Sequence, residues 1–224
     1  MNYRLLIWDF DGTLVDSLEV ALEVYCKLQA SFDLPPIDDP EAVRDLSLTQ
    51  FLGRFQIPVR RVPFLFTAFL REFRSRLDSV KIHDGIGDVL QGLHAEGVRH
   101  AVISSNSKAN IQQCLKTHQL DGLFDFVIGT SRVHGKQRRI AKALKSVSQS
   151  AKNVLYVGDE VRDVEACRQI PLDVVAVEWG LNSAKALQES QPTYQVSQPH
   201  QLWDIVGLPS SNWKLTDGPS VFDS

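Results

Sequence analysis

Short apolar runs divide this chain into segments of strand length separated by polar turns. Runs of this kind, bounded by Gly, Asp, Ser or Asn, are typical of buried strands. The predicted strands are residues 5–8, 98–104, 124–128, 153–157 and 173–177.

A long stretch with helical spacing separates the first predicted strand from the second. A helix is expected to begin at Ser17 and to end before Pro35, and residues 38–56 also have a helical, mixed pattern. From Val62 onward, apolar residues repeat at helical spacing, and we interpret this mostly phenylalanine row as a packing surface rather than a cofactor site: Phe66, Phe69, Phe73 and Leu77. Residues 17–80 are therefore predicted to be entirely helical, as a domain inserted into a strand–helix alternation.

Strand and helix patterns alternate after residue 80. The last predicted helix covers residues 183–189, and short segments at residues 194–196 and 202–206 follow it. Periodicity is lost from Pro209 onward, where we expect a flexible tail. The domain organisation expected from the sequence is an α/β core of residues 1–16 and 81–208, a helical insert of residues 17–80 and a tail of residues 209–224.

The composition, with 43% hydrophobic and 23% charged residues in a chain of 224, is that of an ordinary globular protein. A net charge of −3 without a basic run argues against a nucleic-acid partner, and no apolar run is long enough to span a membrane. Acids stand where a signal peptide needs small neutral residues, so we expect a cytoplasmic protein. Three separated cysteines support neither a disulfide framework nor a zinc site and are expected to be reduced core residues: Cys26, Cys114 and Cys167. The sequence does not indicate an oligomeric state.

Two acidic residues, Asp9 and Asp11, directly follow the first predicted strand. Because side chains alternate along a strand, both carboxylates can point the same way into the crevice beyond its carboxyl end. Like charges this close need a compensating cation or a shared proton, and a hard ion such as Mg2+, often accompanied by phosphate, meets that need. A solvated turn rich in Asp, Gly and Thr is the alternative interpretation.

The nine residues from Asp9 to Ser17, DFDGTLVDS, resemble the first motif of the haloacid dehalogenase (HAD) superfamily, most of whose members are phosphatases. The resemblance implies that Asp9 is the nucleophile that becomes an aspartyl-phosphate. It also implies that Asp11 is the general acid and base.

A hydroxyl-rich turn, residues 104–107, ends the second predicted strand and leads into a helical pattern. Its side chains can cap the helix, and the helix N-terminus can also hold a phosphate. The turn resembles the second HAD motif, which implies a phosphate-binding role for Ser105, with Asn106 beside it. Ser104 is the alternative in another register.

Lys136 follows Gly135 at the start of a helical pattern, where the HAD superfamily carries the lysine of its third motif. The resemblance implies that Lys136 holds the phosphate and offsets the charge of the nucleophile. Many relatives have proline directly after this lysine, whereas Gln137 stands here. The alternatives in other registers are Arg132, Arg138 and Arg139, while His134 is expected on the surface.

The segment GDEVRD, residues 158–163, follows the fourth predicted strand and resembles the fourth HAD motif, GDxxxD. The resemblance implies one Mg2+ between two strand ends, bound by Asp9, Asp159, the backbone carbonyl of Asp11, a phosphate oxygen and waters. Asp163, one helical turn on, is expected to bind the ion through water or to orient Lys136. An ordinary first-turn acid favoured by the helix dipole is the alternative for Asp163.

All four motifs occur in order within residues 4–206, and the chain resembles the phosphoglycolate phosphatase-like branch of the superfamily. The resemblance implies a doubly wound parallel α/β sheet, a Rossmann-type core, with a helical cap domain inserted between the first and second motifs. It implies a Mg2+-dependent phosphatase that hydrolyses a small phosphorylated metabolite, with no nucleic-acid or membrane partner. A sugar phosphomutase of the same fold and a catalytically idle regulatory protein are the alternatives. A haloalkanoate dehalogenase is disfavoured, since Asp11 and the metal-binding acids serve phosphate chemistry.

Overall fold

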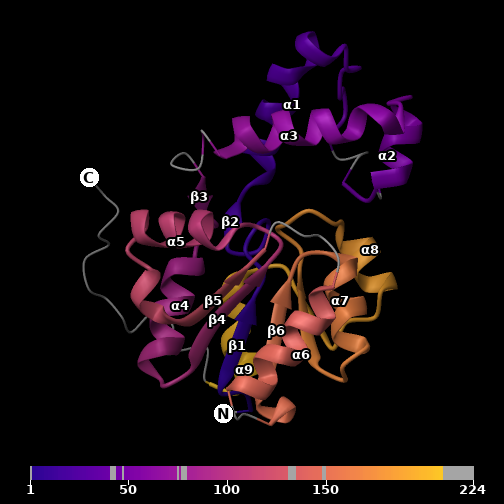
Figure 1. The fold of residues 1–224 in the computed structure, drawn as a ribbon. Coiled ribbons are helices and arrows are strands. Elements are labelled where there is room, and N and C mark those ends of the chain that lie inside the picture. The colour runs from indigo at the N-terminus through magenta and orange to yellow at the C-terminus, as the bar shows by residue number, and fades with distance from the viewer. Residues whose placement is uncertain are drawn as a thin grey trace.

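The computed structural model describes residues 2–40, 44–46, 48–74, 76, 80–130, 135–147 and 150–208. Its centre is a six-stranded sheet with the strand order β5-β4-β1-β6-β7-β8, in which every neighbouring pair is parallel (Figure 1). These strands are β1 (Leu5–Trp8), β4 (Arg99–Ser104), β5 (Phe124–Gly129), β6 (Val154–Gly158), β7 (Asp173–Val177) and β8 (Tyr194–Val196). The tail expected at residues 209–224 lies outside the described residues.

Strand β1 is buried on both faces, and its side chains alternate between two hydrophobic clusters. Leu6 and Trp8 belong to the cluster formed with α4 (Ile86–Ala95), α5 (Lys108–Thr117) and α9 (Leu202–Val206). Leu5 and Ile7 belong to the cluster on the opposite face. That second cluster is formed with α6 (Lys136–Ser146), α7 (Val161–Arg168) and α8 (Ala184–Glu189). Helices therefore cover both faces, and the expected doubly wound parallel sheet is confirmed.

Helices α1 (Leu18–Phe32), α2 (Leu48–Arg54) and α3 (Val62–Arg74) lie together above the end of the sheet toward which its strands run (Figure 1). We call residues 17–80 the helical insert. A two-stranded antiparallel ribbon of β2 (Val15–Asp16) and β3 (Lys81–Ile82) joins it to the sheet. The sequence analysis did not predict this ribbon.

The prediction that residues 17–80 are entirely helical is wrong in two parts. Residues 33–40 with 44–46, and residues 55–58, are not helical, and within the described part of residues 38–56 the helix is only α2. Prolines at positions 35, 36 and 40 explain the first break, because proline lacks the N–H that a helix interior needs and restricts the residue before it.

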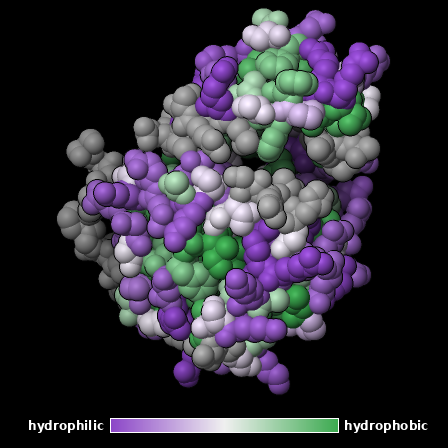
Figure 2. Space-filling view, viewed as in Figure 1, coloured by the Kyte–Doolittle hydropathy of each residue, from purple (hydrophilic) through white to green (hydrophobic). Residues whose placement is uncertain are grey.

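The phenylalanine row of α3 is divided between packing and solvent. Phe73 is buried and Phe69 packs against the core, stacked on Phe73. Phe64 and Phe66 are exposed, at 74% and 48% of their surface, and Figure 2 shows hydrophobic surface on the helical insert. The interpretation of the row as a packing surface therefore holds for its second half only. Two cysteines are buried as expected, whereas Cys26 on α1 is exposed.

Candidate active site

The adjacent strands β1 and β6 bring two of the acidic motifs together. Trp8 pairs with Val157, and the next residue, Asp9, donates its backbone N–H to the carbonyl of Val157 at 2.8 Å. Asp9 and Asp159 therefore leave the same edge of the sheet side by side. Their exposed fractions are 2% and 0%, so both carboxylates are removed from bulk water.

Lys136, the first residue of α6, lies between two of these acids. Its Nζ donates to Asp9 Oδ2 at 2.5 Å and also to Asp163 Oδ1. Burial alone would lower the pKa of Lys136, but the Asp163 and Asp9 carboxylates outweigh it and raise that pKa above its usual value. Lys136 is therefore a fixed, buried cation.

Two of the alternatives to Lys136 are among the described residues. Arg138 is exposed on α6, and Arg139 is half-buried on the same helix. Arg132 and His134 lie outside the described residues. The hydrogen bond from Lys136 to Asp9 supports Lys136 as the lysine of the third motif.

Asp11 is half-buried and faces the turn after β4. Asn106 Nδ2 donates to both of its carboxylate oxygens, at 3.2 and 3.1 Å. Burial, followed by the negative charge of Asp9, raises the pKa of Asp11 to about 7, although the Asn106 hydrogen bond opposes this. A carboxyl group with that pKa exchanges a proton near neutral pH, as a general acid and base must.

The two serines of the turn have different surroundings. Ser104 is fully buried at the end of β4, and its Oγ accepts the backbone N–H of Asn106 at 3.0 Å. Ser105 is half-buried and directly follows β4. Ser107 caps α5 by accepting the N–H of Asn110 at 3.2 Å. Helix capping and turn formation thus occupy Ser104 and Ser107.

Asp159 is held by groups on two other segments. Thr13 Oγ1 donates to its Oδ1 at 2.6 Å, and the N–H of Leu181 donates to its Oδ2 at 2.7 Å. Burial, with the charges of Glu160 and Asp9, raises the pKa of Asp159 well above its usual value despite the Leu181 hydrogen bond.

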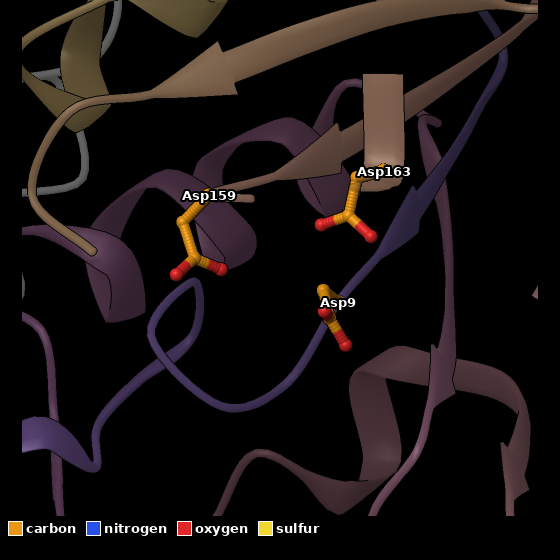
Figure 3. A group of neighbouring side chains, drawn as sticks. All are labelled: Asp9, Asp159 and Asp163. Carbon is orange, nitrogen blue, oxygen red and sulfur yellow. The ribbon is translucent and has the colours of Figure 1, made fainter. Parts of the chain in front are cut away.

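Asp9, Asp159 and Asp163 converge on one space, as Figure 3 shows. Each offers a carboxylate oxygen, and these three oxygens lie within 4.8 Å of one another. Asp163 Oδ2 is buried and has no hydrogen-bond partner among the described residues. Burial raises the pKa of Asp163 to about 7, with Lys136 opposing the rise. An excess of oxygen ligands and negative charge in a buried space fits a hard divalent cation such as Mg2+.

The sequence analysis missed some residues of this site. Thr13 lies inside the first motif but was given no role, and nothing singled out Leu181 because it acts through its backbone N–H. Trp179 donates its indole N–H to the carbonyl of Thr13 at 3.0 Å. The only signal available was that residues 178–182 directly follow the strand β7, at the edge where the other motifs end.

Comparison with known proteins places this arrangement in a family. The family profile described as "haloacid dehalogenase-like hydrolase" matches residues 6–177. The chain belongs to this family. The HAD-like phosphatase expected from the motifs is thereby confirmed as to family and enzyme class.

Relatives and solved structures agree with the HAD assignment over nearly the whole chain. A phosphoglycolate phosphatase of Synechococcus elongatus is 31% identical over 205 residues, which are 91% of this chain and 97% of that protein. The pyrophosphatase PpaX of Anoxybacillus flavithermus is 23% identical over 227 residues, which cover 94% of this chain and 100% of that protein. The HAD-like hydrolase SP0104 of Streptococcus pneumoniae has the same fold, with a TM-score of 0.80 at 18% identity over 91% and 98% of the two chains. Among the described residues, no helix combines the length and apolar character that a membrane span requires.

Proposed function

We propose that this HAD-like hydrolase is a Mg2+-dependent phosphatase of a small phosphomonoester such as phosphoglycolate, with Asp9 as nucleophile. The observation that carries the proposal is the buried group of Asp9, Asp159 and Asp163 around Lys136, with Asp11 beside it. The phosphoglycolate phosphatase named above, which is 31% identical, supports the substrate class.

The surroundings of Asp9 suit a nucleophile. Its Oδ1 accepts the N–H of Phe10 at 2.8 Å, and its Oδ2 is held by Lys136, so the carboxylate has one fixed orientation. In the proposed reaction one Asp9 oxygen attacks phosphorus in line while the bond from phosphorus to the leaving oxygen breaks. Asp11 gives a proton to the leaving alcohol and then removes one from the water that hydrolyses phospho-Asp9.

The groups proposed to bind phosphate surround that nucleophile. Lys136 supplies a fixed positive charge, while Ser105 and Asn106 supply a hydroxyl and an amide at the start of α5. Because these donors are held in place before the reaction, they stabilise the charge that develops on the transferring group.

The residues proposed to hold Mg2+ are Asp9, Asp159 and the backbone carbonyl of Asp11, with Asp163 next to them. When bound, the ion offsets the negative charge of the carboxylates and of the phosphoryl group. The positions of Asp9 and Asp159 are set by neighbouring strands and by hydrogen bonds, so the ligands are in place beforehand.

We also propose that the helical insert is a cap domain over the α/β core of residues 1–16 and 81–208. The position of α1 to α3 above the strand ends supports this division. The proposal further includes a cytoplasmic location, which the three free cysteines support.

The test is phosphate release by the purified protein from phosphoglycolate, pyrophosphate and p-nitrophenyl phosphate, with and without Mg2+. We expect Mg2+-dependent release, fastest from phosphoglycolate, and none from Asp9→Asn, because an amide cannot act as the nucleophile. Asp84→Asn, a change of an exposed acid, is the matched control and should keep full activity. Activity in folded Asp9→Asn would refute the nucleophile assignment. Glucose 6-phosphate formed from glucose 1-phosphate without free phosphate would indicate a phosphomutase instead.

A further inference from the structure

A loop after β7, residues 180–182, contacts the candidate metal ligand Asp159 on one side. A Cβ atom added to Gly180 would lie 2.2 Å from Asp159 Cβ, so only glycine allows the loop to approach this closely. The N–H of Leu181 donates to Asp159 Oδ2 at 2.7 Å, and the N–H of Asn182 donates to the Asp159 carbonyl at 3.3 Å. We call residues 180–182 the coupling loop.

The same three residues contact the helical insert on their other side. Arg44 donates from Nη2 to the carbonyl of Gly180 and from Nε to that of Leu181 at 2.9 Å. Asn182 Nδ2 donates to the carbonyl of Arg44 at 3.0 Å. Every residue of the coupling loop thus lies between Asp159 and Arg44.

The neighbouring residues, Asp45 and Ser183, extend this contact. Asp45 accepts the N–H of Ser183 at 2.8 Å and the Ser183 hydroxyl at 2.6 Å. Ser183 in turn caps α8 by accepting the N–H of Ala186. The insert is therefore fixed to the start of a core helix as well as to the loop.

Asn182 also reaches the segment that carries the acids. Its Oδ1 accepts the N–H of Val161, the first residue of α7, at 2.9 Å. One amide side chain thus joins the insert, through Arg44, to the turn between Asp159 and Asp163.

We propose that the coupling loop, with Asn182 as its positioning residue, links the docking of the helical insert to the position of the Asp159 carboxylate. Docking of Arg44 and Asp45 then holds the carboxylate in place for Mg2+, and bound Mg2+ favours the docked insert by the same factor, since coupling between two sites is reciprocal. This inference rests on the proposed function, because it takes Asp159 as a ligand of Mg2+.

The test is Mg2+ binding to the purified protein by isothermal titration calorimetry, without substrate. The double variant Arg44→Ala/Asp45→Ala leaves the net charge unchanged and changes none of the residues proposed to bind Mg2+ or phosphate. We expect it to bind Mg2+ about fivefold or more weakly. Asn182→Ala should have the same effect. Arg60→Ala, an exposed arginine of the same insert, is the matched control and should bind as the wild type does.

The outcomes separate this inference from the proposed function. Unchanged Mg2+ affinity in the folded double variant and in Asn182→Ala would overturn the coupling while leaving the phosphatase proposal intact. A wild-type protein that binds no Mg2+ would overturn both. A purely structural role would lower the melting temperature of the variants without changing their Mg2+ affinity. Should the double variant fail to fold, Arg44→Lys, which keeps the charge but loses the forked donor, is expected to bind Mg2+ more weakly than the wild type.

Discussion

Lys136 is the residue on which the charge balance of the site depends. Its ammonium contacts Asp9 and Asp163, while Asp159 and Asp11 contact uncharged donors. The buried carboxylates outnumber the nearby cations even when Arg162, which pairs with Glu160, is counted, and proton uptake or a bound cation must offset the negative excess. The raised pKa values of Asp11, Asp159 and Asp163 are the first of these responses. The proposed Mg2+ is the second.

His100 in β4 is also buried and titratable, but its hydrogen-bond partners are Trp8 and Leu90 rather than the acids of the candidate site. Trp8 Nε1 can only donate, so His100 Nδ1 accepts its hydrogen bond at 3.2 Å, and the proton sits on Nε2, which faces the Leu90 carbonyl at 3.1 Å. Burial, and to a smaller extent the neighbouring His94, lowers the pKa of His100 to about 4, although Leu90 and Asp125 oppose this. The folded protein therefore holds His100 neutral.

We predict that His100 makes the protein lose stability in mild acid. The pKa of His100 is lower in the folded than in the unfolded chain. Its full contribution to the free energy of unfolding is therefore present above pH 6.5 and is lost as the pH falls toward 4. From the two pKa values the loss at pH 5 is about 2 kcal/mol. The measurement is urea unfolding of the wild type and His100→Gln at pH 7.5 and pH 5. Both proteins contain the same buried acids, so subtracting their two stability changes removes the opposite contribution of those acids. An equal loss of stability between pH 7.5 and pH 5 in both proteins would contradict the prediction.

At the residue scale, the sequence reveals groups that act through side chains within a motif. Asp9 and Asp159 were singled out because acids at strand ends need a compensating charge, and Lys136 was singled out because its place matches the third HAD motif. The structure brings these three residues together. Leu181 was not, because it acts through its backbone N–H, which leaves no trace in a sequence. Asn182 was not, because its side-chain amide bonds only backbone groups of distant segments, which no motif indicates. Their position depends on the path of a loop that only the fold determines.

At the scale of elements, α4 contains two glycines with opposite surroundings. A Cβ added to Gly87 would meet nothing within 4 Å, whereas one added to Gly92 would lie 2.6 Å from Trp203 Cζ2 of α9. Gly92 therefore allows the buried indole of Trp203 to pack directly on the helix backbone. Gly87 has no such contact and only weakens the helix.

We predict opposite effects of alanine at these two positions of one helix. Gly87→Ala should raise the free energy of unfolding by up to about 1 kcal/mol, because alanine loses less backbone entropy in a helix. Gly92→Ala should lower it by about 1–3 kcal/mol, because the added methyl group overpacks the contact with Trp203. Urea unfolding of the two variants checks both, each serving as the control for the other. Equal stability of the two would show that α9 does not pack on α4 in this way.

The burial and the length of each element decided whether it could be predicted from the sequence. All five predicted strands are present, because β1 and its parallel neighbours are buried on both faces and so appear as continuous apolar runs. The ribbon of β2 and β3 was missed because strands of two residues have no detectable period. Residues 38–56 were misjudged because a mixed pattern without a clear apolar face does not define a helix.

At the scale of the whole molecule, the core could be predicted from the sequence, whereas the placement of the helical insert could not. Continuous apolar runs predict the strands, and the family resemblance predicts the doubly wound topology. In contrast, the contacts of Arg44 and Asp45 with residues 180–183 join positions more than 130 residues apart through loops. No periodicity encodes such contacts, so they become visible only in the folded chain.

The helical insert is expected to limit the size of the substrate. The helical insert lies above the strand ends that carry Asp9 and Asp159, and Arg44 and Asp45 fix part of it to the core beside them. Under the cap proposal, a phosphate reaches the site beneath the insert, which favours small esters.

The matched substrates are free phosphoserine and the same phosphoserine within a folded phosphoprotein, compared by kcat/KM for phosphate release. We expect the folded protein to react more slowly by on the order of a hundredfold, because a phosphate that cannot be aligned with Asp9 loses the advantage of positioning. Equal rates would mean that the insert leaves the strand ends open to large substrates. In that case the cap proposal would be wrong, even if the chemistry of Asp9 were as proposed.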